Sequence, residues 1–199
     1  MRPAIVLLEF DAIAVGILAG DAMAKRAPLK TLHTGTVHPG RYLVLAGGEV
    51  ADLEEALAAA KEVGASRLRD EIFLPDVHPD VVDAISGKRC DWSATALGVF
   101  ETRTVPALIR SADRAVKGTN VTLLEVRLAD GLGGKGYALF AGDVADVEAA
   151  IEACNESLAD PDLLEAMVVI PRIHPEMIEN LLSHPEFGHR VSGYKGAVG

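Results

Sequence analysis

The chain contains one stretch of sequence twice, and this repeat limits what it can fold into. The segment from Ala96 to Val126 has an altered copy from Ala4 to Leu32, in which Glu101 corresponds to Glu9, a displacement of 92 residues (101 − 9). Two later landmarks keep the same order at slightly larger displacements: residues 142–146 repeat 48–52 at 94 (142 − 48), and residues 171–175 repeat 75–79 at 96 (171 − 75). Small loop insertions between elements of constant length produce such a drift. The 199 residues are therefore predicted to form two similar domains, at residues 1–90 and 95–199.

Composition argues against several kinds of partner. The formal net charge is −10, and neither half carries a basic run, which disfavours nucleic acid and anionic membrane surfaces. No stretch of eighteen apolar residues predicts a membrane span, and the apolar N-terminal run is interrupted by Glu9, so it is not predicted to be a targeting signal. Cys90 and Cys154 form no CxxC pair and are not equivalent in the repeat, which favours a reduced, cytosolic chain.

Each half has the pattern of a strand, a helix, two strands, a helix, a strand and a short helix. The predicted elements of the first half are 4–8, 12–26, 29–37, 41–46, 50–63, 70–75 and 80–85, and those of the second are 97–100, 104–117, 121–128, 137–140, 144–156, 166–170 and 175–182. The polar stretch 86–94 is predicted to be a linker, and the tail from 183 to be loose. This order predicts an α+β fold, with an antiparallel sheet and helices on one face in each domain, of the ferredoxin-like class.

The first helix carries two glycines on its apolar face. Ile13, Gly16, Ile17, Gly20 and Ala24 follow helical spacing. Each glycine costs roughly 1 kcal/mol in a helix interior. Their presence predicts that this helix lies very close to a sheet or to another subunit.

No catalytic constellation is found. The stretch 131–136, GLGGKG, matches G-x-G-x-x-G, but a strand follows it instead of a helix, which excludes a dinucleotide site and favours a hairpin turn. Among the histidines, His38 stands out, because it occupies the tip of the turn equivalent to this glycine-rich one. One imidazole binds metal weakly, but a three-fold axis through the turn would bring three together. The adjacent carboxylates Asp70 and Glu71 are predicted to be solvated.

Four stretches resemble the shell domain of bacterial microcompartments. They are ALGVFETRTVPALIRSADRAVKGTNVTL, the turn GLGGKGY, AGDVADVEAA and VIPRIHP, and the first half of the chain resembles a second such domain. The similarity is greatest to the tandem-domain trimeric class, such as that of propanediol-utilising compartments. The resemblance implies a homotrimer of six domains that forms a pseudohexagonal tile in a protein shell in the bacterial cytoplasm. The implied role is structural and not enzymatic, with other shell proteins as partners and the enclosed enzymes as further candidates.

The resemblance also implies where the working residues of the tile lie. The tile-edge residues are Lys25, Lys117, Arg172 and His174, and Asp76 stands where the first copy would have the arginine. The residues of the central pore are Val37, His38, Pro39, Gly40, Gly131, Gly133, Gly134 and Lys135. Glycines would let backbones crowd an axis, and Lys135 would add positive potential near the opening.

Three hypotheses about the pore and the function remain open on the sequence alone. In the propanediol relative the turn carries a cysteine, and three of these hold an iron–sulfur cluster on the axis, whereas this chain has His38. Thiolate is the usual cluster ligand. We therefore expect an open pore that passes small metabolites and holds no cofactor. The alternative is a redox conduit, in which His38 from three copies holds a zinc, nickel or ferrous ion, or a cluster. The third hypothesis is a ligand-sensing trimeric regulator, a role that ferredoxin-like trimers also serve.

Overall fold

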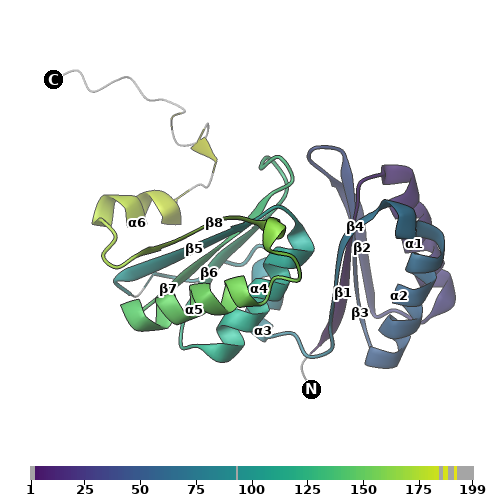
Figure 1. Cartoon of the computed structure of the whole chain (residues 1–199), viewed down its shortest axis with the longest axis horizontal. Helices are drawn as coiled ribbons and strands as arrows, with labels where there is room; N and C mark the ends of the chain where they lie inside the picture. The colour runs from purple at the N-terminus through teal and green to yellow at the C-terminus, as the bar shows by residue number, and fades with distance from the viewer. Residues whose placement is uncertain (1–2, 93, 184–185, 188–190, 192–199) are drawn as a thin grey trace.

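The computed structural model describes residues 3–92, 94–183, 186–187 and 191, and it contains the same unit twice in two adjoining lobes (Figure 1). The first comprises β1 (Ala4–Phe10), α1 (Ile13–Arg26), β2 (Thr31–Val37), β3 (Arg41–Gly48), α2 (Val50–Gly64), a 3₁₀ turn (Ala65–Arg67), β4 (Leu68–Leu74) and α3 (Pro79–Ile85). The second comprises β5 (Ala96–Thr102), α4 (Val105–Gly118), β6 (Thr122–Leu128), β7 (Gly136–Gly142), α5 (Val144–Glu156), a 3₁₀ turn (Pro161–Leu163), β8 (Leu164–Ile170) and α6 (Pro175–Leu182).

Both sheets have the same antiparallel topology. Their strand orders are β2-β3-β1-β4 and β6-β7-β5-β8, and Ala4 opposes Gly48 as Ala96 opposes Gly142. The pair α1 and α2 covers one face of the first sheet, and α4 and α5 cover the same face of the second. The predicted ferredoxin-like fold is confirmed. The short α6 lies on the opposite face of the second sheet (Figure 1), so the expectation of helices on one face holds only for the two long helices of each repeat.

The central strand β1 is buried on both sides. Val6, Leu8 and Phe10 face α1 and α2, whereas Ile5 and Leu7 belong to an apolar cluster shared with the second domain. Two apolar environments explain why the sequence reads as a continuous apolar run and not as an alternating one. The second domain therefore covers part of the face of the first sheet that its own helices leave open.

The glycines of α1 allow close packing against its own sheet. A Cβ on Gly16 would lie 2.5 Å from Cδ1 of Tyr42 on β3. In the second domain the sizes are exchanged: Leu108 corresponds to Gly16, and a Cβ on Gly136, the counterpart of Tyr42, would lie 2.8 Å from Leu108 Cδ2. The prediction of close approach to a sheet is confirmed for Gly16, while Ile13 and Ile17 of the same helix remain exposed.

The predicted linker is partly an element of the second domain's structure. Cys90, Trp92 and Ala94 pack against an apolar cluster on the face of the second sheet that also carries α6. The backbone N–H of Cys90 donates to the carbonyl of Leu124 on β6 (3.1 Å). Within the described residues, no helix is both long and apolar enough to cross a membrane. The predicted loose tail lies mostly outside the described residues.

Candidate functional site: the domain junction and the paired turns

The N-terminus of α4 is capped by two carboxylates of the first domain. Glu9 Oε2 accepts from the backbone N–H of Val105 (2.8 Å), and Asp70 Oδ2 accepts from that of Ala107 (3.1 Å). The same oxygen of Asp70 accepts from the hydroxyl of Thr104. The first N–H groups of a helix have no partner within it and carry partial positive charge, so carboxylates satisfy them well. Strands β1 and β4 thus hold α4 across the domain junction.

Glu9 is fully buried and compensated by cations. Its Oε1 accepts from Arg41 Nη1 (2.7 Å) and lies 3.6 Å from Arg69 Nε. Burial raises the pKa of Glu9 above 4.5, while the Val105 N–H and the two arginines oppose that rise. A buried carboxylate of this kind depends on its partners, because an unpaired one costs several kcal/mol.

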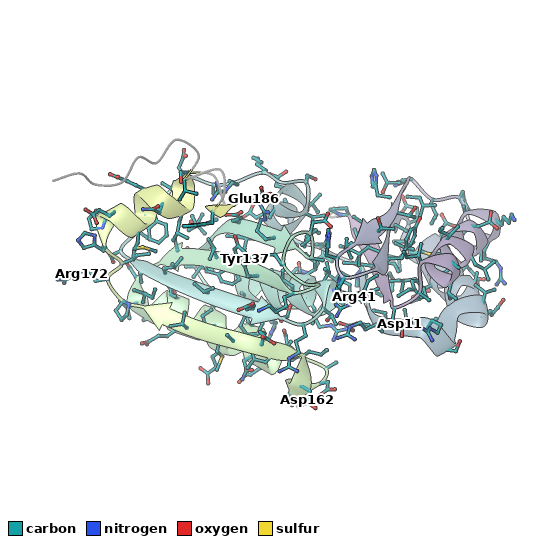
Figure 2. The ribbon with its side chains drawn as sticks, turned by 90° about the horizontal axis from the view of Figure 1, so that it is seen from above. Asp11, Arg41, Tyr137, Asp162, Arg172 and Glu186 are labelled. Carbon is teal, nitrogen blue, oxygen red and sulfur yellow. The ribbon has the colours of Figure 1, made fainter. Side chains whose placement is uncertain are left out.

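Arg41 ties the two domains together at the base of the hairpin turns. Its Nη1 also donates to the carbonyls of Arg103 (3.1 Å) and Gly134 (3.0 Å), and Figure 2 shows Arg41 between the two lobes. Gly134 has a positive φ of 85°, and a Cβ there would lie 2.6 Å from Arg41 Nη1. Glycine is therefore required at 134 both by backbone conformation and by the guanidinium beside it.

The two turns expected at a pore lie next to each other. The tips of the β2–β3 and β6–β7 hairpins approach one another at the same end of the molecule (Figure 1), and His38 Nδ1 lies 3.9 Å from Asp130 Oδ1. The His38 side chain is 75% exposed, and Val37 is half-buried beside the exposed Pro39 and Gly40. Gly131 and Gly133 are exposed with positive φ and have open space around them.

Lys135 belongs to an ion-pair cluster and is not an isolated charge at the turn. Its Nζ lies 2.7 Å from Glu101 Oε1 and 3.5 Å from Glu165 Oε1, and the hydrogen bond to Glu101 raises the pKa of Lys135. This pair is the counterpart of Arg41 with Glu9. The positive potential expected from Lys135 is therefore largely balanced by two carboxylates.

Of the residues expected at tile edges, only Lys117 lies next to the segment that was expected beside it. Lys117 Nζ donates to the carbonyl of Asp76 and to Asp113 Oδ2, and the other Asp113 oxygen accepts from the N–H of His78 (2.7 Å). Lys117 thus lies beside the counterparts of Arg172 and His174. Lys25 pairs with its helix neighbour Asp21 (2.6 Å) and is 74% exposed. Arg172 and His174 are exposed, and Figure 2 places Arg172 at the outer end of the second lobe.

The expectation that Asp70 is solvated is wrong. Asp70 caps α4, and one carboxylate oxygen of its neighbour Glu71 is buried without a hydrogen-bond partner, while the other accepts from Lys61. Adjacent strand residues point to opposite faces, as expected, but each face of β4 is covered. A signal for the junction was available in the repeat: the acid–base pair of Glu9 and Arg41 recurs as Glu101 and Lys135.

The thiols lie away from the turns. Cys154 is buried in the core, where its Sγ contacts the carbonyl of Ser111 (3.3 Å) and burial raises the pKa of the thiol, and Cys90 packs in the linker. Among the described residues of a single chain, no group of three or more His, Cys, Asp or Glu side chains could hold a metal ion. The donors at the turn, an exposed imidazole and no thiolate, do not fit an iron–sulfur cluster.

The comparisons with known proteins agree with the repeated fold. The BMC domain model matches twice, at residues 4–77 and 96–173. The chain belongs to the BMC domain family. It is 43% identical over 177 residues to the bacterial microcompartment shell protein PduT of Citrobacter freundii, covering 89% of this chain and 96% of that relative.

Two further relatives match different shares of the chain, the first less than half of it and the second most of it. The bacterial microcompartment shell protein EutM of Salmonella typhimurium is 38% identical over 84 residues, which are 42% of this chain and 85% of EutM. A crystal structure of a microcompartment protein from Desulfitobacterium hafniense DCB matches with a TM-score of 0.77 at 38% identity. The match covers 90% of this chain and 99% of the chain in that crystal structure. This BMC protein is therefore a structural shell protein of a bacterial microcompartment and not an enzyme.

Proposed function

We propose that three copies of this BMC protein close into a six-lobed shell tile with a central pore through which small metabolites pass. The observation that carries the proposal is the junction between the two domains of one chain. Because the domains are repeats, the contact from the first domain to the second can be made again from the second domain to the first domain of another copy. A contact that repeats head to tail closes into a ring when its rotation allows.

Apolar residues buried at the intrachain junction have exposed counterparts. Val105 and Ile109 of α4 are 0% exposed against the first sheet, whereas their counterparts Ile13 and Ile17 of α1 are 39% and 54% exposed. Ile72 of β4 is 1% exposed, and its counterpart Val168 of β8 is 48% exposed. Because exposed apolar side chains gathered on equivalent surfaces mark an interface, we infer that β8 of one copy packs against α1 of the next.

Residues that make polar contacts at the intrachain junction have apolar counterparts at the proposed junction between copies. Thr104 and Asp70, which bond each other in the chain, correspond to Ala12 and Ala166. Arg110, which donates to the carbonyl of Glu71, corresponds to Leu18, 49% exposed. At these three positions the proposed inter-copy junction thus has apolar residues on both sides, so neither member of the Thr104–Asp70 pair stands there without the other.

The same equivalence explains Glu101 and Lys25. Glu101, the counterpart of Glu9, would accept from the N–H of Ile13 of the next copy, and Lys25 of that next copy would meet the backbone of Arg172, as Lys117 meets Asp76. Three copies would then bring their paired turns around one axis, with His38 on its rim. The remaining exposed edges, which carry Arg172 and His174, would contact other shell tiles.

Native mass tests the ring directly. A trimer of about 63 kDa (3 × 21.0) is expected. Ile17→Asp should yield monomers, since an uncompensated carboxylate in each junction costs about 3 kcal/mol or more. Val63→Asp, on a 41% exposed residue of α2, is the matched control and should remain trimeric. A wild-type chain that stays monomeric contradicts the proposal.

We further propose that the pore holds no cofactor. Support comes from the donor set, in which one exposed imidazole per chain stands at the turn. Metal analysis and visible absorbance of anaerobically purified trimer should reveal neither metal nor cluster. A stoichiometric metal that is lost in His38→Ala would replace the open pore by a metal-bearing conduit, and saturable binding of a small molecule in clefts between subunits would instead favour a regulator.

Tile-to-tile assembly is tested by electron microscopy of concentrated trimer. We expect two-dimensional sheets of tiles that include other shell proteins when these are mixed in. An acidic side chain at an edge, Arg172→Glu or His174→Glu, should disperse the sheets and leave the trimer mass unchanged. Persistence of the sheets in both variants would place the tile edges elsewhere.

A further inference from the structure

An apolar groove remains open on the first domain. It has a volume of about 430 Å³ and runs between β1, β2 and β3 on one side and the end of α3 on the other, and Val105, Leu128 and Asp130 of the second domain complete its lining. The first-domain residues include Leu7, His33, Leu43, Leu45 and Ile85. An adjoining hollow of about 550 Å³ shares His33, Leu45 and Ile85 with it. The groove lies on the face of the first sheet that is opposite α1 and α2.

The equivalent place on the second domain is filled by the chain itself. Leu139, the counterpart of Leu45, belongs to the apolar cluster on which Cys90 and Trp92 pack. These two residues belong to the segment that comes after α3, and α3 itself packs on β6. The second sheet is thus covered by the linker that leaves the short helix of the preceding domain.

In the repeat, the residues after α6 are the counterpart of the linker after α3. The α6 helix is the counterpart of α3, and Phe187 follows its C-cap Ser183 by four residues, as Cys90 follows the C-cap Ser86 of α3. Phe187 is 76% exposed, the most exposed large apolar side chain among the described residues. Burial of such a phenyl ring is favourable, because it removes a large apolar surface from water.

We propose, resting on the trimeric ring, that the Glu186–Phe187 segment of one copy closes the first-domain groove of the next. Within the chain α3 packs on β6 and the linker continues across the sheet. Between copies α6 would pack on β2, and the segment after it would run across the first sheet, where Phe187 enters the groove as Cys90 and Trp92 enter the cluster on the second sheet.

The charges of the proposed contact between copies are complementary, with the signs exchanged relative to the contact within the chain. In the chain, Arg89 of the linker pairs with Glu125 of β6 (2.6 Å). Glu125 opposes Leu139 in the ladder as His33 opposes Leu45, so His33 is its counterpart. Where the linker is basic and the strand acidic, the segment after α6 carries Glu186 and the strand carries an imidazole.

A disulfide tests the contact between copies. The variant His33→Cys/Phe187→Cys, in a Cys90→Ser background, should on mild oxidation give cross-linked dimers and trimers on a non-reducing gel. Ile17→Cys/Val168→Cys in the same background reports the ring itself. If the control pair cross-links and the His33/Phe187 pair does not, this inference is overturned while the ring stands. If neither cross-links and the native mass is that of a monomer, both proposals fail.

Fluorescence provides a second measurement that needs no oxidation. Trp92 is the only tryptophan, so Trp92→Phe/Phe187→Trp places a single reporter at 187. Its emission should lie at shorter wavelength in the trimer than in the same protein made monomeric by Ile17→Asp. Equal emission from trimer and monomer would show that residue 187 stays in solvent, and the groove would then be open to another occupant.

Discussion

The carboxylate of Glu9 accepts a hydrogen bond from the backbone N–H of Val105, which lies 96 residues further along the chain. This contact joins a strand of one repeat to a helix of the other. With Asp70 it gives α4 a cap that is supplied entirely by the preceding domain. The N-terminus of α4 is therefore fully capped only when the first domain is in place.

Glu9 should make stability depend on pH in a defined sense. Because its pKa is raised above 4.5 in the folded protein, the folded state binds more protons than the unfolded state between 4.5 and that raised pKa. The contribution of Glu9 to the free energy of unfolding is thus most favourable below 4.5 and falls as pH rises through the folded pKa. We would measure the free energy of unfolding of wild type and of Glu9→Gln by denaturant at several pH values. The value for wild type minus that for the variant should decrease as pH rises. A difference that increases would mean that the arginines outweigh burial.

Asp70 should contribute more to the free energy of unfolding than an exposed surface carboxylate does. Asp70→Ala removes the acceptor for Thr104 and for the N–H of Ala107 and should cost about 1–2 kcal/mol in urea unfolding. Asp83→Ala is the control, because it breaks only an exposed surface pair with Lys88, which solvent screens and which should contribute little to stability. Equal effects of the two substitutions would argue against a capping role for Asp70.

Gly16 should not tolerate a methyl group. Alanine normally favours a helix over glycine by about 1 kcal/mol, but a Cβ at 16 would meet the Cβ and ring of Tyr42 at 2.5–2.8 Å. We expect Gly16→Ala to destabilise the protein by about 1–3 kcal/mol through overpacking. Gly118→Ala, where no atom lies within 4 Å of the new Cβ, should be neutral or stabilising. Stabilisation by Gly16→Ala would mean that Tyr42 moves aside freely.

The fold was predictable because it rests on local periodicity and on the repeat. Strands and helices recur in the same order, and two copies of one pattern support each other. The junction was less accessible. Asp70 reads as a surface carboxylate because its partners, Thr104 and Ala107, lie more than thirty residues away and belong to the other domain. Nothing in the local sequence distinguishes a cap supplied across domains from a solvated acid.

The turns illustrate the same limit. The glycines at 131, 133 and 134 predict positive φ, and the structure confirms it. Only the structure reveals that Gly134 is also confined by Arg41, and that Lys135 is paired with Glu101 and Glu165. Side-chain pairing between elements depends on register, which composition and motif spacing do not supply.

The Thr–Asp pair that caps α4 at the intrachain junction should also form at the inter-copy junction when the same two residues are introduced there. Ala166→Asp alone would bury a carboxylate beside Ala12 of the next copy and should weaken the trimer, because that charge has no hydroxyl partner. Ala12→Thr with Ala166→Asp restores both members of the Thr104–Asp70 pair and should strengthen each junction by about 0.5–2 kcal/mol relative to the single aspartate. Trimer dissociation on dilution measures both effects. If the double variant dissociates as readily as Ala166→Asp alone, the two positions do not meet, and the equivalence of the junctions fails.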